Sequence, residues 1–214
     1  MKSSDISIHL TPGLRLEQAM ACAGVQTPAS ITKLTVTGTI TVSDFNYIEK
    51  TMRNTLQELD LGNALVKSSK FLSPTYALSG LISITIPKTV RNFNYSVLEN
   101  YSALTSIKAH PDDPFYSTQE GVLYNKDKSE LLRCPKGRKG ECTIPDSVTL
   151  IAYDAFNGCS GLTSVTIPAS VVDIGIYAFY HCPAFFTVHP DNPVYESVEG
   201  EIRRKPKSFT KKDF

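Results

Sequence analysis

The residues that decide the fold run from Leu162 to Phe185 and read LTSVTIPASVVDIGIYAFYHCPAF. The segment from Leu81 to Leu104, LISITIPKTVRNFNYSVLENYSAL, repeats this pattern, with apolar residues at offsets of 0, 3, 5, 9, 12 and 17 and a proline at offset 6. The same frame fits the stretch that begins at Lys139, and it fits two earlier units of 25 residues that begin at Ile31 and Leu56. These related units predict a repeat protein.

Each unit has a direct physical interpretation. Val165 and Ile167 point to one side of a short strand, while Ser164 and Thr166 point to the other. Pro168 has no N–H to donate and ends the strand. One unit cannot bury its apolar side alone, whereas units stacked with parallel strands form a continuous core. The sequence therefore predicts an α/β solenoid, a right-handed coil with short parallel strands, irregular or helical returns and inserted β-hairpins.

The segments LTSVTIPASVVDIGIYAFYHC and CTIPDSVTLIAYDAFNGCSGL resemble the BspA-like class of leucine-rich repeats, which are cell-surface and secreted proteins of host-associated bacteria. The resemblance covers roughly Ile31 to the C-terminus and is strongest at 81–109 and 139–190. The two early units depart from it, because they lack both the Ile-Pro step and the Ala-Phe pair. The resemblance implies a leucine-rich-repeat solenoid, adhesion to host or microbial proteins as its role, and no catalytic residues.

Two insertions interrupt the repeat. The segment HPDDPFYSTQEGVLYNKDKSELLRCP, at about 110–135, recurs 79 residues later as HPDNPVYESVEGEIRRKPKSF, at about 189–210. We expect a turn followed by a hairpin in each, with strands at 122–124 and 131–132 in the first copy. The solenoid then spans 31–200, and the basic tail, 201–214, completes the last hairpin.

The first thirty residues differ from the repeats. Asp5 to Leu10 alternates like a short strand, and Thr11 and Pro12 fit the N-cap and first position of a helix that ends near Gly24. Because the first layer of a stacked core needs a cover, we expect 1–30 to form a strand-helix cap.

Few residues suggest chemistry. His110 and His189 stand in the same HPD[DN]P turn, but one histidine with one or two carboxylates does not supply the three or four ligands of a metal site, so a structural turn is favoured. The five cysteines show no zinc-binding or CxxC spacing. Cys159 and Cys182 are expected to stack in neighbouring coils as free thiols, with a disulfide as the alternative. No phosphate loop, nucleophile motif or zinc motif is present, so we expect no enzyme, cofactor or metal.

Composition limits the partners. The net charge of +1 argues against whole-surface attraction to nucleic acid or anionic membranes. The sequence contains no run of eighteen apolar residues, so we expect no membrane insertion. The first thirty residues show no signal peptide, although the resemblance implies an extracellular or cell-surface location. The basic tail is interpreted as a solvated terminus, with contact to an acidic polymer as the alternative.

A binding surface is expected where outward strand positions of successive units align. This predicted face is rich in hydroxyl groups, which suit adaptable polar contact but are also ordinary solvent-facing strand residues. Its members are Lys33, Thr35, Glu58, Asp60, Ser83, Thr85, Ser106, Lys108, Thr143, Ser164 and Thr166. The hairpins add four candidate aromatic anchors, namely Phe115, Tyr116, Tyr124 and Tyr195.

Three functions remain at this stage. The first is a monomeric binding or adhesion module for an extracellular protein or glycan. The second is a structural spacer within a larger surface protein. The third is an enzyme or glycan-processing accessory, for which no residue gives support. The identity of the ligand follows from none of these patterns.

Overall fold

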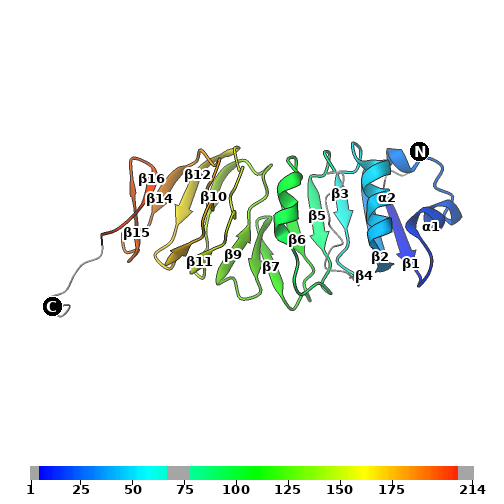
Figure 1. The fold of residues 1–214 in the computed structure, drawn as a ribbon, viewed down its shortest axis with the longest axis horizontal. Coiled ribbons are helices and arrows are strands. Elements are labelled where there is room, and N and C mark those ends of the chain that lie inside the picture. The colour runs from blue at the N-terminus through cyan, green and yellow to red at the C-terminus, as the bar shows by residue number, and fades with distance from the viewer. Residues whose placement is uncertain (1–4, 67–77, 207–214) are drawn as a thin grey trace.

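The computed structural model describes residues 5–66 and 78–206, which form an elongated stack of short strands (Figure 1). The first strand lies at one end of the stack and the last lies at the other, with successive units side by side between them. Most strand pairs are parallel, as the repeat predicts. The chain therefore has the strand arrangement of a leucine-rich-repeat fold.

The first half of the stack is a six-stranded sheet. Its main path is β1-β2-β3-β5-β6, all parallel, and β4 pairs with the end of β2. The strands are β1 (Asp5–Leu10), β2 (Lys33–Ile40), β3 (Glu58–Asp60), β4 (Ala64–Val66), β5 (Ser83–Ile86) and β6 (Ser106–Ala109). Leu34, Leu59, Ile84 and Ile107 are register partners across four strands, and all four are buried. This row corresponds to offset 3 of the repeat.

The second half contains two further parallel ladders. One is β10-β12-β14, and the other is β9-β11-β13, which β8 and β7 extend with antiparallel pairs. The strands are β7 (Tyr116–Gln119), β8 (Val122–Asn125), β9 (Glu130–Arg133), β10 (Gly140–Thr143), β11 (Leu150–Ile151), β12 (Leu162–Ile167), β13 (Asp173–Ile174) and β14 (Phe185–Val188). Phe156 and Phe179, at offset 17 of consecutive units, stack with their ring centroids 4.9 Å apart. The stacking predicted for the repeat core is thus present.

The first insertion is larger than the expected hairpin. Tyr116–Gln119 is a strand that the sequence analysis missed, so β7, β8 and β9 form a three-stranded meander. The second insertion has the equivalent first hairpin, β15 (Tyr195–Val198) with β16 (Glu201–Arg204), while 207–210 lies outside the described residues.

A Glu-Gly pair makes the turn in each insertion. Glu120 and Gly121 have φ values of 50° and 78°, and Glu199 and Gly200 have values of 52° and 81°. Two positive φ angles are the signature of the tight turns that join antiparallel strands. A Cβ on Gly200 would lie 2.4 Å from Cδ2 of Phe185, so a larger residue there would displace this exposed ring.

Two α-helices pack against the N-terminal strands. The helices are α1 (Leu16–Cys22) and α2 (Val42–Met52), and short 3-10 turns lie at η1 (Pro28–Ser30) and η2 (Tyr95–Asn100). The expected helix start at Thr11 is wrong, because Gly13, with a φ of 88°, closes a turn from Thr11 to Leu14 that no α-helix can contain. The predicted end is confirmed, since Gly24 follows the helix with a φ of 74°.

The strand of the N-terminal segment also has a role that the sequence analysis did not assign. Six consecutive residues of β1 pair in parallel with β2, so this segment adds a strand to the ladder itself. We propose that α1, whose Leu16 and Met20 are buried, covers the apolar end of the stack.

Candidate ligand-binding face

The outward side of the first sheet carries two rows of polar residues. One row consists of Asp5, Lys33, Glu58, Ser83 and Ser106, which are register partners from β1 to β6. The Nζ atom of Lys33 lies 3.6 Å from Asp5 Oδ2 and 3.9 Å from Glu58 Oε2. Such exposed pairs add little stability, but their alternating charge gives this row a fixed electrostatic pattern.

The second row runs through Ser7, Thr35, Asp60, Thr85 and Lys108. The carboxylate of Asp60 is held in place because its Oδ1 accepts a hydrogen bond of 2.9 Å from the backbone N–H of Gly62. Lys108 on β6 is exposed. This row therefore offers a positioned carboxylate, a hydroxyl and an exposed ammonium on three adjacent strands.

The two rows together border a hollow of about 200 Å³. Its lining consists of Lys33, Glu58, Leu59, Asp60, Ser83, Thr85 and Lys108. Six of these residues belong to the predicted face, and only Leu59 does not. The structure thus brings the residues of this part of the predicted face together, although Ser83 is itself buried. Thr35 and Ser106 lie in the rows beside the hollow without lining it.

The other members of the predicted face lie elsewhere. Thr143, Ser164 and Thr166 belong to β10 and β12, which are in a different sheet. The expectation of one continuous surface is wrong, because the first insertion takes the free edge of β6: the N–H of Ile107 donates to the carbonyl of Gly121 at 2.9 Å. The second insertion does the same at β14, where Phe186 N–H donates to Gly200 O at 2.9 Å.

Sequence reasoning also missed members of the face. Asp5 and Ser7 extend the two rows onto β1, and His9 Nδ1 lies 2.9 Å from Thr37 Oγ1 at the far end of β1 and β2. The signal was present, because Asp5–Leu10 alternates as the repeat strands do. On the second sheet Glu141, Phe185 and Thr187 complete the outward positions.

The proposed aromatic anchors on the insertions are largely unavailable. Tyr116, Tyr124 and Tyr195 are buried, so their assignment as exposed anchors is wrong. The hydroxyl of Tyr116 donates to Arg91 O at 2.7 Å and accepts from Phe93 N–H at 2.9 Å, which ties the insertion to the preceding unit. Burial raises the pKa of Tyr124, as expected for a phenol in the core. These three rings therefore contribute to core packing and offer no exposed ring to a ligand.

Phe115 is the exception among the four. It is half-buried, contacts Tyr116 edge-to-face at 6.5 Å between centroids, and has the Arg91 guanidinium 5.9 Å from its ring centre. One ring covered in this way is a minor feature of the surface. It lies on the loop before β7 and does not line the hollow.

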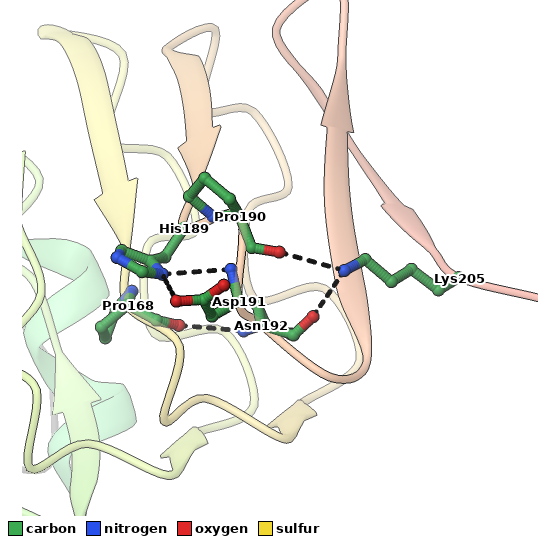
Figure 2. Close-up of polar contacts among 6 residues, drawn as sticks. All are labelled: Pro168, His189, Pro190, Asp191, Asn192 and Lys205. Carbon is green, nitrogen blue, oxygen red and sulfur yellow. Dashed lines mark hydrogen bonds and ion pairs between the residues drawn. The ribbon is translucent and has the colours of Figure 1, made fainter.

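Each HPD[DN]P motif forms a tight turn, shown for the second copy in Figure 2. His189 Nδ1 accepts from the N–H of Asp191 at 3.2 Å, and Asn192 Oδ1 accepts from the N–H groups of Val194 and Tyr195 at 2.9 and 2.7 Å. Lys205 Nζ donates to Asn192 O at 2.6 Å. All these contacts serve the backbone. Within 5–66 and 78–206, no three His, Cys, Asp or Glu side chains converge as a metal site.

Cys159 and Cys182 are buried free thiols, as expected, and no disulfide joins them. Cys159 Sγ donates to the carbonyls of Cys134 and Pro135, at 3.6 and 3.7 Å. The Cys134 thiol lies within hydrogen-bonding reach of Cys142 and Cys159, which lowers the pKa of those two thiols, while the same contacts and burial hold the pKa of Cys134 well above its usual range. All five cysteines are free thiols, and four of them are shielded from solvent.

The repeats match a known protein family. A family model described as a BspA type leucine rich repeat region matches residues 39–139 and 136–196, in six copies. The chain belongs to the BspA-type leucine-rich repeat family. The match confirms the resemblance carried by the Ile-Pro and Ala-Phe steps. A search of curated proteins gave no match to this BspA-type chain.

Three solved structures are similar to this BspA-type chain. The pneumococcal vaccine antigen PcpA is 19% identical over 62% of this chain and 40% of its own, with a TM-score of 0.47. A leucine-rich cell-surface protein of Faecalibacterium prausnitzii A2-165 is 23% identical over 73% and 44%, with a TM-score of 0.42. A leucine-rich repeat protein of Eubacterium ventriosum is 20% identical over 86% and 59%, with a TM-score of 0.42. This chain spans less than two thirds of each.

The helices of this BspA-type protein are short. Among the described residues, none is long and apolar enough to cross a lipid bilayer.

Proposed function

We propose that this protein is a non-enzymatic binding module that acts at the cell surface or outside the cell, and that it holds its ligand in the hollow on the first sheet. Membership of the BspA-type family supports a binding or adhesion role. The observation that carries the proposal is the convergence of six outward residues around one hollow of about 200 Å³. We infer further that the units wind as one right-handed solenoid, since parallel crossovers are almost always right-handed.

The chemistry of the hollow indicates the class of ligand. Lys33 and Lys108 supply cations at its two sides, Glu58 and Asp60 supply carboxylates on the strand between them, and Thr85 supplies a hydroxyl. A ligand that fits presents both donors and acceptors over a short distance, as a polar peptide segment or a glycan does. The lining of the hollow is mostly polar, so hydrogen bonds and charge complementarity set specificity more than apolar burial does.

A spacer role is the second candidate, and the shape of the molecule favours it. β1 and β16 lie at opposite ends of the elongated stack, so anything joined to the two ends is held apart (Figure 1). The two roles are compatible, and a binding assay separates them.

The test is a screen of extracellular-matrix proteins and a glycan array, followed by variants. Thr85→Glu with Lys108→Glu places two new carboxylates at the hollow and is expected to lower the affinity of any ligand found at least tenfold. Thr166→Glu is the matched control for Thr85→Glu alone, because each adds one carboxylate and Thr166 is exposed on the other sheet. Equal affinity of the double variant and the wild type would exclude the hollow as the site. A wild type that binds no probe would leave the spacer role as the better account.

A further inference from the structure

Three exposed tyrosines gather on the turns that follow β11 and β13. Tyr153, Tyr177 and Tyr180 expose 54, 57 and 56% of their surface, and the neighbouring Ile176 exposes 70%. Soluble proteins scatter single apolar residues over the surface, but a contiguous group of large rings marks an interaction site. These turns belong to the ladder of β9, β11 and β13, away from the sheet that carries the hollow.

The rings touch one another in a chain. Tyr153 and Tyr177 meet edge-to-face with centroids 6.0 Å apart, and Tyr177 and Tyr180 meet at 5.7 Å. Tyr180 in turn contacts the imidazole of His181 at 4.0 Å. These four residues, Tyr153, Tyr177, Tyr180 and His181, form what we call the aromatic wall. Because each ring is supported by the next, the wall presents a preorganised surface at low cost in side-chain entropy.

The fold does not require these rings. Asp154, in the unit that begins at Lys139, occupies the same repeat position as Tyr177, in the unit that begins at Leu162. Both residues adopt the left-handed conformation, with φ values of 56° and 58°. Gly158 likewise occupies the same repeat position as His181, and their φ values are 76° and 55°. Left-handed backbone suits glycine and aspartate and is costly for a bulky residue. The turn therefore forms without aromatic residues at these two positions, and Tyr177 and His181 are retained at a cost to local stability.

The charged groups at the Tyr153 end of the wall are the carboxylates of Asp154 and Glu99 and the buried guanidinium of Arg133, whose Nη1 donates to the Asp154 carbonyl at 2.6 Å. The carboxylate of Asp154 raises the pKa of the exposed Tyr153 phenol, with smaller contributions from the neighbouring Tyr177 and the more distant Glu99. The Asp154 carboxylate is fixed, because its Oδ1 accepts from Asn157 Nδ2 at 2.8 Å. The side chain of Lys136 passes close to Gly158, at the position equivalent to His181. Exposed ring faces beside a fixed carboxylate are complementary to a cation.

We propose that the aromatic wall binds a segment of a partner protein that carries arginine or lysine side chains, with the cationic head between the tyrosine rings and Asp154. An arginine stacks its planar guanidinium on a ring while it donates to the carboxylate. Tyrosine and arginine are also the residues that dominate protein interfaces. This surface is separate from the hollow, so the BspA-type chain would engage two partners, or two parts of one partner, at once.

The test uses the whole chain, labelled for NMR, and two peptides as probes. A tetra-arginine peptide is titrated at low salt, beside a tetra-citrulline peptide of the same shape without charge. We expect saturable shifts at the ring protons of Tyr153, Tyr177 and Tyr180 with the arginine peptide, and binding at least tenfold weaker with the citrulline peptide. Equal binding of both peptides, or shifts confined to other acidic residues, would overturn the proposal.

Variants that copy residue types of the preceding unit locate the site without unfolding it. Tyr177→Asn with Tyr180→Asn places residues that tolerate these backbones, since Asp154 and Asn157 hold the equivalent positions. We expect at least a tenfold loss of arginine-peptide affinity with a melting temperature no lower than that of the wild type, and a roughly threefold loss of affinity for Asp154→Asn. Retained affinity in the double variant would overturn the proposal.

Two further experiments distinguish the aromatic wall from the hollow and a cationic partner from a carbohydrate. Thr85→Glu with Lys108→Glu alters the hollow and should leave arginine-peptide binding at the wall unchanged, whatever it does to the ligand of the hollow. A neutral oligosaccharide whose binding is lost in the tyrosine double variant but unaffected by Asp154→Asn would make the wall a carbohydrate site and refute a cationic partner.

Discussion

Asn192 donates its side-chain amide to the carbonyl of Pro168, 2.9 Å away, and so joins the second insertion to the strand of the preceding unit (Figure 2). The same Nδ2 donates to Val171 O, also at 2.9 Å. In the first insertion the equivalent residue is Asp113, and the equivalent carbonyls belong to Pro87 and Val90. An ionised carboxylate has no proton to donate. Asp113 Oδ2 is accordingly buried without a hydrogen-bond partner among the described residues.

We therefore predict that Asp113→Asn stabilises the protein. The new amide keeps the oxygen that accepts from Phe115 and Tyr116 and gains the donor that Asn192 uses. Because a buried unsatisfied polar atom costs about 1–3 kcal/mol, the free energy of unfolding should rise by a similar amount. Urea denaturation measures it. Asn192→Asp should lower the value, and Asp112→Asn, at an exposed position, should leave it unchanged. A less stable Asp113→Asn variant would contradict this account of the turn.

A second prediction concerns Asp44, which serves two helices. Its Oδ2 accepts from Thr41 N–H at 2.9 Å at the start of α2, and its Oδ1 accepts from Leu16 N–H at 2.8 Å at the start of α1. Asp44→Ala removes both caps at a buried position and should lower the free energy of unfolding by about 2–4 kcal/mol. Thr41→Ala disturbs only α2 and should lower it by about 1 kcal/mol. Equal losses in the two variants would show that the contact with Leu16 contributes nothing.

The protein should lose stability at alkaline pH. Burial raises the pKa of Tyr101 and Tyr124, and it raises the pKa of Cys182 to about 11. The unfolded chain therefore releases these protons at a lower pH than the folded chain does. Stability is fully present below the unfolded cysteine pKa, about 8.5, and falls as the pH rises toward 11, by on the order of 2 kcal/mol. Urea midpoints between pH 7 and 11 measure the decline, which Tyr101→Phe should make shallower. A constant midpoint over this range would argue against neutral buried phenols.

Cysteine labelling provides a further check on the packing. Cys22 is exposed, whereas Cys134, Cys142, Cys159 and Cys182 are buried. Iodoacetamide at pH 8 should therefore modify Cys22 alone in the native protein and all five cysteines in denaturant, as intact-mass spectrometry can count. The lowered pKa of Cys142 and Cys159 favours reaction, but the reagent cannot reach a buried thiol. Native labelling of Cys159 at the rate of Cys22 would contradict the buried cluster.

The sequence analysis succeeded where the local pattern and the packing of the whole chain both require the same residues to be buried. Val165 and Ile167 alternate with Ser164 and Thr166, and only stacking on neighbouring units buries the apolar pair. In the units that begin at Leu81, Lys139 and Leu162, the Ile-Pro step marks the end of the strand because proline lacks a donor. Where it failed, distant segments compete for one edge. Nothing in β6 itself shows that Gly121 will accept the N–H of Ile107 and divide the outward surface into two sheets.

The sequence alone therefore determined the repeat, the parallel stacking of its strands and the family, because burial of evenly spaced apolar residues admits few other solutions. Only the tertiary structure decided which outward residues meet. It placed Lys33, Asp60 and Lys108 around one hollow, buried Tyr124 in the core, and lined up Tyr153 with Tyr177 on the surface. Such meetings depend on the register between units and on the edge that each insertion occupies, and neither is recorded in the pattern of a single repeat.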